Sequence, residues 1–247
     1  MSFWPRRKRV QLVEIQPDLV RLERRLFLRN GLSLGALTML TGCDLTDGDT
    51  VDKVLWAMSR WNDKVQAFLF DPDRLAPTYG TSDITKPFPF NAFYDIDGGD
   101  WKLEVSGLVQ DRTPWTLDRL RTLPQQSQIT RHICIEGWSA IGQWGGVRFS
   151  DFLARVGADT RARYVSFRCA DDYRGSIDMA TALHPQTLLA LTFRGAPLPP
   201  RYGFPAKLRV PTKLGFKNPK HIVAIEVNNT FPGGFWEDYG YNWFSGL

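Results

Sequence analysis

Hydrophobic residues of the chain recur at helical spacing before residue 70 and at strand spacing beyond residue 100. The helical set lies three or four residues apart, as one face of an amphipathic helix requires: Val51, Val54, Leu55, Met58, Trp61, Val65, Phe68 and Leu69. It predicts a helix of about five turns that packs on the rest of the protein. A position on a membrane surface is the alternative, which charges of both signs on the polar face disfavour.

Runs rich in β-branched and aromatic residues, bounded by Gly, Pro, Asn or Asp, predict six strands. They span residues 101–107, 129–136, 164–169, 187–193, 208–210 and 222–228. Short helices are predicted between them at 116–123, 150–156 with Ser150 as the N-cap, and 176–183. Because strands dominate and the helices are short, the predicted fold class is α+β rather than a doubly wound sheet.

The first 42 residues have the pattern of an export signal. Arg24 and Arg25 precede an apolar run rich in Leu, Gly, Ala and Thr that is too short to span a bilayer. The arginine pair resembles the twin-arginine motif, which directs the export of folded proteins. The run ends in LTGC, which resembles a bacterial lipobox with Cys43 as the lipidated residue. This predicts a lipoprotein anchored on the periplasmic side of the inner membrane.

Charge and length divide the chain into three parts. Residues 1–42 hold eight of the 31 basic and three of the 26 acidic side chains, so they account for the whole net charge of +5. The remainder is formally neutral, which excludes a nucleic acid partner. We expect a signal peptide at 1–42, a tether with the amphipathic helix and a Pro-rich loop at 43–90, and one domain with an aromatic tail at 91–247.

Besides Cys43, the chain holds two cysteines, Cys134 and Cys169, and several roles are open to them. In an oxidising compartment they could form a disulfide, or each could be a small buried hydrophobic residue. Cys134 could also be a nucleophile with His132 as its base. Zinc is disfavoured, because the three histidines are scattered at 132, 184 and 221. A single thiolate can instead anchor a soft metal whose other ligands belong to an organic cofactor.

Two motifs resemble a known family. CIEGWS, at 134–139, resembles the motif in which a cysteine binds molybdenum in the sulfite oxidase superfamily. LPPRYGFPAKLRVPTKLGFKNPKHIVAIEV, at 198–227, resembles the segment that surrounds the pterin and its phosphate. The chain from 91 to about 228 is most similar to the catalytic subunit of bacterial periplasmic methionine-sulfoxide reductases. The resemblance implies a strand-rich molybdopterin-binding fold, with molybdenum and molybdopterin as cofactors and Cys134 as the metal ligand.

The resemblance also implies a set of cofactor-binding residues. The GFK loop corresponds to the phosphate loop, and Lys207 stands where the reductases carry an arginine. Tyr202 replaces an asparagine, and Cys169 replaces a threonine that touches the cofactor, which favours a pocket-lining thiol over a disulfide. His184 is either a pterin partner or a cap of the preceding helix. The implied set is Asn91, Tyr94, Asp95, Cys169, His184, Tyr202, Lys207, Gly215, Phe216 and Lys217.

Glu136 and His132 are further candidate catalytic residues beside Cys134. On an extended strand, residues two apart share a face, so we expect both side chains near the sulfur. Glu136 could supply protons for oxygen-atom transfer, or it could form a salt bridge with Arg131 or Arg174. His132 has no equivalent in the reductase motif.

The predicted activity is reduction of a small S-oxide or N-oxide by oxygen-atom transfer. Sulfite oxidation is the alternative, for which Arg131, Arg148 or Arg174 could form a cationic pocket. A lipid-anchored binding domain without metal is the non-enzymatic alternative.

No heme-attachment motif, iron–sulfur cysteine set or dinucleotide fingerprint occurs in the sequence. We therefore expect a monomeric catalytic subunit that receives electrons from a b-type cytochrome or another quinone-linked subunit in the membrane. The aromatic tail at 232–247 is a candidate docking surface for that partner, or it packs over the domain.

Overall fold

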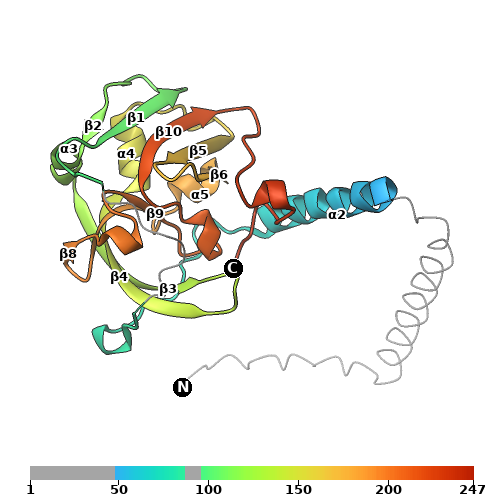
Figure 1. Ribbon diagram of the computed structural model, residues 1–247, viewed down its shortest axis with the longest axis horizontal. Coiled ribbons are helices and arrows are strands. Elements are labelled where there is room, and N and C mark those ends of the chain that lie inside the picture. Colours follow the sequence, from blue (N-terminus) through green and yellow to red (C-terminus); the bar gives the residue numbers. More distant parts are fainter. Residues whose placement is uncertain (1–47, 87–95) are drawn as a thin grey trace, which may run out of the picture. The chain divides into compact units, whose positions relative to one another are not determined.

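The computed structural model describes residues 48–86 and 96–247 (Figure 1). The chain forms two compact units, Met1–Ala57 and Met58–Leu247, and the boundary between them falls within helix α2 (Gly48–Leu69). The export signal and three predicted cofactor residues, Asn91, Tyr94 and Asp95, lie outside the described residues. Within 48–86 and 96–247, no helix combines the length and apolar character that a transmembrane span requires.

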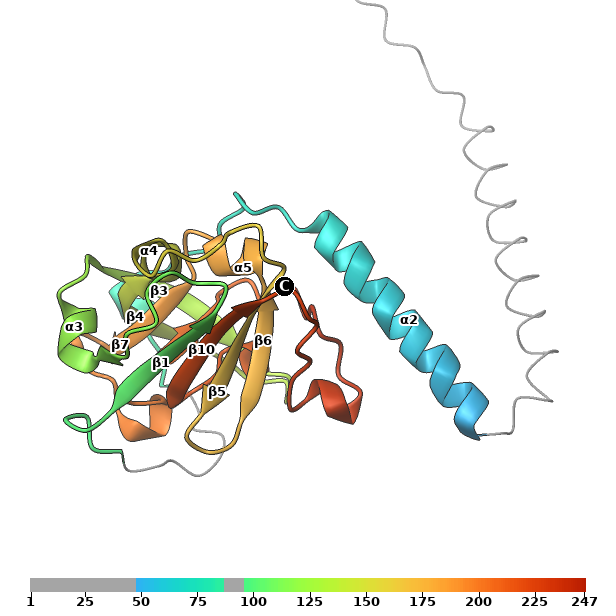
Figure 2. The same cartoon turned by 90° about the horizontal axis from the view of Figure 1, so that it is seen from above.

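One five-stranded sheet contains the parallel strand pair of the fold (Figure 2). Its strands lie in the order β2 (Trp115–Thr116), β1 (Lys102–Gly107), β10 (Ile222–Asn228), β5 (Tyr164–Cys169) and β6 (Arg174–Asp178). β1 and β10 are parallel, and the other neighbours are antiparallel. Alternate residues of β1 and β5 are buried, as in a sheet with one face on the core.

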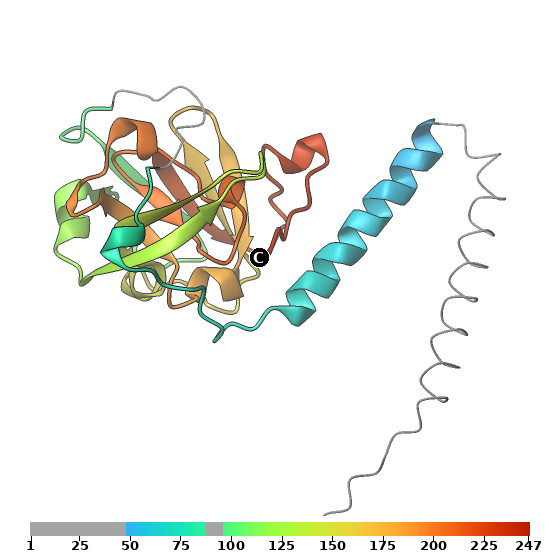
Figure 3. The ribbon, with the colours of Figure 1, turned by 90° about the horizontal axis from the view of Figure 1, so that it is seen from below.

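The second sheet is built on a long hairpin (Figure 3). β3 (Gln125–Ile133) pairs along its whole length with β4 (Ser139–Arg148), which then pairs with β7 (Leu188–Phe193). β7 also pairs with the short strands β8 (Ala196–Pro197) and β9 (Lys207–Arg209). β9 thereby carries charged side chains into the interior.

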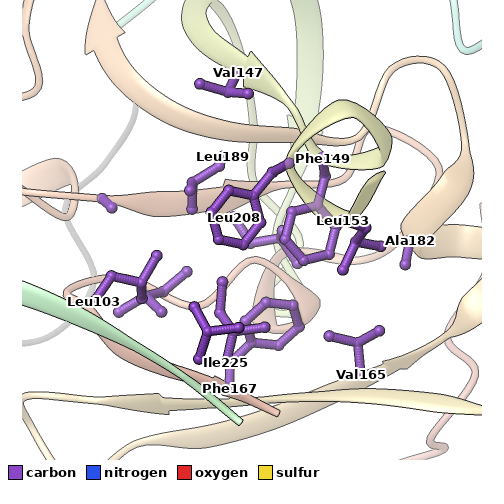
Figure 4. Close-up of a cluster of buried hydrophobic side chains, with 14 of the residues drawn as sticks. Leu103, Val147, Phe149, Leu153, Val165, Phe167, Ala182, Leu189, Leu208 and Ile225 are labelled. Atoms are coloured by element: carbon purple, nitrogen blue, oxygen red, sulfur yellow. The ribbon is translucent and has the colours of Figure 1, made fainter. Parts of the chain in front are cut away.

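The main hydrophobic core lies between the two sheets (Figure 4). Side chains from β1, β5 and β10 face side chains from β4, β7 and β9, with the helix that follows β4 packed among them. Its fully buried members include Leu103, Val147, Phe149, Leu153, Val165, Leu189, Leu208 and Ile225. Burying a side chain of this size stabilises the fold by about 1.5–3 kcal/mol, so the core is the main source of stability.

The helices around the sheets are short. The α-helices are α3 (Leu117–Arg121), α4 (Phe149–Arg155) and α5 (Met179–Leu183). The 3₁₀ turns are η2 (Thr81–Asp83), η3 (Pro200–Tyr202), η4 (Gly215–Lys217) and η5 (Glu237–Tyr239). The predicted α+β class with short helices is confirmed.

The strand predictions were accurate where strands are apolar. The predicted strands at 164–169 and 222–228 have the observed bounds, and those at 101–107, 187–193 and 208–210 differ by one residue. The prediction for 129–136 was wrong at both ends, because β3 begins in a polar segment at Gln125 and ends at Ile133. β4, β6 and the two-residue strands β2 and β8 were not predicted.

Two helix predictions need correction. α4 begins at Phe149, and its N-cap position is Arg148 rather than Ser150, with no side-chain cap. α5 begins only at Met179, because residues 176–178 belong to β6. Asp178 caps α5 by accepting a hydrogen bond from the Thr181 N–H at 2.8 Å.

The helix predicted at 51–69 is confirmed as α2, but the side chains that hydrogen-bond to the domain come from its polar face. Asp63 accepts a hydrogen bond from the Phe244 N–H at 2.8 Å, and Gln66 accepts one from the Gly246 N–H at 3.0 Å. Burial raises the pKa of the Asp63 carboxyl. Most of the predicted apolar face is exposed instead of packed, and polar residues of α2 hold the C-terminal segment.

Candidate active site

Cys134 lies in the turn that joins β3 to β4. Its N–H donates to the Trp138 carbonyl at 2.9 Å, and the Gly137 N–H donates back to the Cys134 carbonyl at 3.2 Å. Gly137 has a φ of +91°, a left-handed conformation that glycine adopts without a steric penalty. The tight turn therefore fixes the thiol at the tip of the long hairpin.

Glu136 lies beside the thiol, although not for the reason that an extended strand would give. Cys134 Sγ is 3.6 Å from Glu136 Oε2, and the same oxygen accepts a hydrogen bond from Trp138 Nε1 at 3.0 Å. These contacts stand in place of a salt bridge to Arg131 or Arg174. Burial and the nearby Glu136 carboxylate both raise the pKa of the Cys134 thiol. The free chain therefore holds a thiol, and a bound metal ion would favour the thiolate.

The His132 side chain packs between the hairpin turn and η4. A Cβ at Gly215 would approach His132 Nε2 to 2.8 Å, so only glycine permits this contact between the hairpin and η4. His132 Nδ1 is buried and has no hydrogen-bond partner among the described residues. Burial lowers the pKa of the imidazole, and Lys207 and Arg209 lower it further. His132 is therefore a neutral polar group that packs under the turn.

A cavity of about 240 Å³ opens in front of Cys134. Its walls come from the hairpin turn, from the β5–β6 turn, from the segment 201–220 and from the C-terminal segment. The lining residues are His132, Cys134, Ile135, Glu136, Trp138, Trp144, Asp171, Tyr173, Arg201, Tyr202, Lys207, Gly215, Phe216, Asn218, Pro219, Lys220, Trp236 and Tyr241. Five residues predicted from the sequence meet here besides Cys134 and Glu136: His132, Tyr202, Lys207, Gly215 and Phe216.

Three cationic side chains line the cavity, together with the carboxylates of Glu136 and Asp171. Lys207 is buried, and among the described residues it forms no ion pair; its ammonium lies 5.5 Å from the centre of the Trp144 ring. Burial lowers the pKa of Lys207, and the nearby Lys220 and Arg209 lower it further. Arg201 and Lys220 also line the cavity. A buried cation without a carboxylate, as Lys207 is in the described part of the chain, is costly, so an anionic ligand beside Lys207 would offset this cost.

Arg209, which no sequence motif indicated, connects β9 to the hairpin. It is fully buried, and its Nη2 donates to the Arg131 carbonyl at 2.6 Å and to Thr130 Oγ1 at 3.2 Å. Its Nη1 donates to Asn218 Oδ1 at 2.9 Å. All these acceptors are neutral. Arg209 thus positions the end of β3 and contributes charge behind the cavity.

The loop Gly215–Lys217 is held from two sides. Tyr173 donates its hydroxyl proton to the Phe216 carbonyl at 2.6 Å. Lys217 is buried and forms an ion pair of 2.5 Å with Glu237, in the aromatic tail. The C-terminal segment lies beside the hairpin tip (Figures 1 and 3), and its Trp236 and Tyr241 line the cavity. The tail therefore packs over the domain and forms one wall of the site.

Three predicted cofactor residues lie outside the cavity wall. Lys217 points to Glu237 instead of the cavity. Cys169 is buried in the main core, where burial raises the pKa of its thiol. His184 terminates α5, and its Nε2 lies 3.1 Å from the Arg74 carbonyl, which agrees with a capping role.

The positions of two cysteines and three arginines settle further questions that the sequence left open. Cys134 and Cys169 are both free thiols, so they form no disulfide with each other. The three arginines considered for a sulfite pocket lie elsewhere: Arg131 over Tyr79, Arg148 beside Gln126 and Arg174 in an ion pair with Asp238. Any anion in the cavity would instead meet Arg201, Lys207 and Lys220.

The residues present fit a pyranopterin cofactor with one metal ion. The cofactor is anionic at its phosphate, and Lys207 is a buried cation without a carboxylate partner in the described part of the chain. Two buried nitrogens that lack partners there, His132 Nδ1 and Trp144 Nε1, belong to lining residues and match a polar ring system. Cys134 offers the one thiolate that such a centre needs from the protein.

Comparison with known proteins decides the family. Residues 90–236 match the family described as "Oxidoreductase molybdopterin binding domain". The chain belongs to this family.

Relatives within it share much of the sequence. A chain of Azospira oryzae, which carries the name of a putative protein-methionine-sulfoxide reductase subunit YedZ1, is 61% identical over 90% of this chain and 87% of its own length. The protein-methionine-sulfoxide reductase catalytic subunit MsrP of Xanthomonas campestris is 34% identical over 62% of this chain. This chain spans about half of that relative, 52% of its length.

A solved structure supports the same fold. The sulfane dehydrogenase SoxCD of Paracoccus pantotrophus superposes with a TM-score of 0.52 at 20% identity, over 56% of this chain and 40% of that one. This likeness shows the fold alone. The chain is thus a molybdopterin-binding oxidoreductase of the sulfite oxidase superfamily, and the cofactors predicted from the sequence are confirmed at the level of the family.

Cys134→Ser should remove turnover while the domain stays folded, because the core and the cationic wall do not involve this side chain. We expect a content of about one molybdenum per chain in the wild type. The variant should keep its pterin and its unfolding temperature, but it should lose the visible absorption of a thiolate–metal bond. Cys169→Ser is the matched control, which should keep both metal and activity. Full activity of Cys134→Ser would contradict the assignment.

Replacing Lys207 with methionine should lower the pterin content, whereas replacing Lys217 with methionine should lower the stability of the fold. Lys207→Met should lower the pterin content roughly tenfold or more, because a charged hydrogen bond to phosphate contributes about 1.5–3 kcal/mol. Lys217→Met should lower the free energy of unfolding of the cofactor-free protein by about 3–5 kcal/mol, because Glu237 is left buried without its cation.

The pterin content is measured as the pterin released from equal amounts of each protein. The free energy of unfolding is measured by denaturant unfolding of the cofactor-free forms. A stable Lys217→Met protein that lacks pterin would restore Lys217 to the phosphate site.

Proposed function

We propose that this oxidoreductase reduces S-oxides of the methionine-sulfoxide type. The observation that carries the proposal is the pairing of Cys134 with Glu136 at an aromatic cavity. The names of the two relatives support the same class of substrate. When bound, the molybdenum cofactor supplies two-electron redox chemistry. Cys134 would hold the metal, and Lys207 would bind the phosphate.

The protein's own side chains supply what the overall reaction needs. Reduction of a sulfoxide breaks one S–O bond, consumes two protons and two electrons, and releases a thioether and water. Glu136 is exposed at the cavity, hydrogen-bonded to Trp138 Nε1, and can exchange protons with solvent beside the metal ligand. Phe216, Trp236 and Tyr241 offer aromatic rings, which make favourable contacts with sulfur.

Sulfite oxidation is the second candidate, and the cationic side chains of the cavity favour it. Arg201 and Lys220 line the same space as Cys134, where they could attract a small anion. A direct assay with a neutral sulfoxide and with the sulfite anion therefore distinguishes S-oxide reduction from sulfite oxidation.

We place the protein on the periplasmic side of the inner membrane as a lipid-anchored subunit. Arg24 and Arg25 support twin-arginine export, and the LTGC sequence supports lipidation of Cys43. A cofactor-loaded enzyme must cross the membrane folded, which this route permits. The electrons for catalysis would come from a b-type cytochrome or another quinone-linked membrane subunit, because the sequence holds no motif for a second redox centre. The catalytic subunit itself would be a monomer.

The purified holoenzyme should oxidise a reduced viologen dye with methionine sulfoxide and leave sulfite unchanged. Glu136→Gln keeps the shape and the hydrogen bond to Trp138 but cannot donate a proton, so its kcat should fall by about 10²–10⁴. Its molybdenum content and KM should stay close to those of the wild type. Faster turnover with sulfite than with any S-oxide would overturn the proposed direction.

Replacing Arg24 and Arg25 with lysine should retain the protein in the cytoplasm, because the export receptor recognises the arginine pair. Cys43→Ser should instead reach the periplasm and lose its covalent lipid. Cell fractionation and mass spectrometry of the N-terminus measure both effects. Normal export of the double-lysine form would refute the proposed route.

A further inference from the structure

Helix α2 presents polar residues of its second half to the domain. Gln66 bonds both Asn242 and the Gly246 N–H, and Asp63 bonds the Phe244 N–H. The Asn242 amide in turn donates to the Ser59 carbonyl at 3.3 Å. Ser59, Asp63 and Gln66 are spaced by four and three residues, so they form one stripe along the helix.

The apolar stripe of the same helix faces away from this contact. Met58 is 64% exposed, Trp61 68%, Phe68 88% and Leu69 71%. Their spacing continues into the first half of α2, where Val51, Val54 and Leu55 fall on the same face. Val65, in the same row, is partly buried. A row of large exposed apolar side chains is unusual on a protein surface and indicates a site that another molecule covers.

Charge on the second half of α2 is separated by face. Arg60 and Lys64 lie four residues apart, and Lys53 falls seven residues before Arg60, so the three share one stripe. Asp63 lies on the other side, where the C-terminal segment uses it. The mixed sign of the helix composition thus conceals a basic flank beside the apolar stripe. A basic flank with Trp and Phe on the apolar face is the arrangement of interfacial helices on anionic membranes.

The position of α2 in the sequence favours the same occupant. The helix begins at Gly48, five residues after Cys43, the proposed lipid site. Fully extended, so few residues span less than about 20 Å. A lipid on Cys43 would therefore keep α2 at the bilayer surface.

We propose that α2 lies along the membrane surface, with its apolar stripe among the lipid headgroups and its basic flank on anionic lipids. This inference rests on the membrane location proposed above. The contacts of α2 with residues 242–246 would then hold the C-terminal segment at the membrane. Because Trp236 and Tyr241 of that segment line the cavity, the metal site would face a membrane-bound electron donor at short range.

Hydrogen exchange of the full chain carrying Cys43→Ser tests the proposal without the covalent lipid. Peptides that cover 58–69 should exchange roughly tenfold more slowly when phosphatidylglycerol-containing vesicles are present at about ten times the dissociation constant. Phe68→Glu should abolish this slowing, because it puts a charge in the apolar stripe. Phe68→Leu keeps an apolar side chain at the same position and should retain it.

The outcomes of this experiment distinguish a membrane surface from a second copy of the chain as the partner of the apolar stripe. Slowing that depends on protein concentration and not on vesicles would assign the stripe to a second copy of the chain and overturn the proposal. Unchanged exchange with vesicles, or equal slowing in Phe68→Glu, would overturn it too. Phe68 lies outside the cavity wall, so dye-linked activity of Phe68→Glu should equal that of the wild type. Absence of vesicle binding in a protein with intact S-oxide reduction would therefore reject this inference alone.

Discussion

The burial of positive charge without matching carboxylates is the constraint on which the site depends. Lys207 and Arg209 enter the interior from the same short strand, and their neighbours are Lys220, neutral acceptors and aromatic rings. Removing such charges from water costs several kcal/mol each unless an anion or good hydrogen bonds offset it. Arg209 obtains its hydrogen bonds from the protein, whereas Lys207 has no carboxylate partner among the described residues. The fold thus leaves one charge for a ligand to neutralise.

The same constraint explains how distant segments are held in register. Arg209 binds the end of β3, so the strand that carries the cation also fixes the hairpin that carries Cys134. On the other side, the buried pair of Lys217 and Glu237 attaches the C-terminal segment to the loop at Gly215. The Cys134 turn, the cationic wall and the aromatic wall are therefore coupled through buried polar contacts, which depend on geometry more strictly than apolar packing does.

The apolar strands and the position of Cys134 at the cavity could be predicted from the sequence, but the polar contacts of the site could not. β4 was missed because Gly142, Gly145 and Gly146 give it a low strand propensity. In the structure a Cβ on Gly146 would lie 2.1 Å from the Leu189 carbonyl, so close strand packing requires glycine there. The ion pair of Lys217 was not predicted, because its partner, Glu237, lies 20 residues away and shares no local pattern with it. Tertiary pairing of this kind leaves no periodic signal.

Helix α2 shows a related limit of prediction from sequence, because the helix could be predicted but the face that contacts the protein could not. Its hydrophobic periodicity predicted the helix correctly, because periodicity depends only on backbone geometry. The face that contacts the protein depends instead on which surface is available, and here the C-terminal segment offers N–H groups near its end that need acceptors. Asp63 and Gln66 satisfy them, so the apolar face is turned outward. An amphipathic pattern alone therefore does not identify the surface a helix packs against, because unsatisfied backbone groups can attract its polar side more strongly than a core attracts its apolar one.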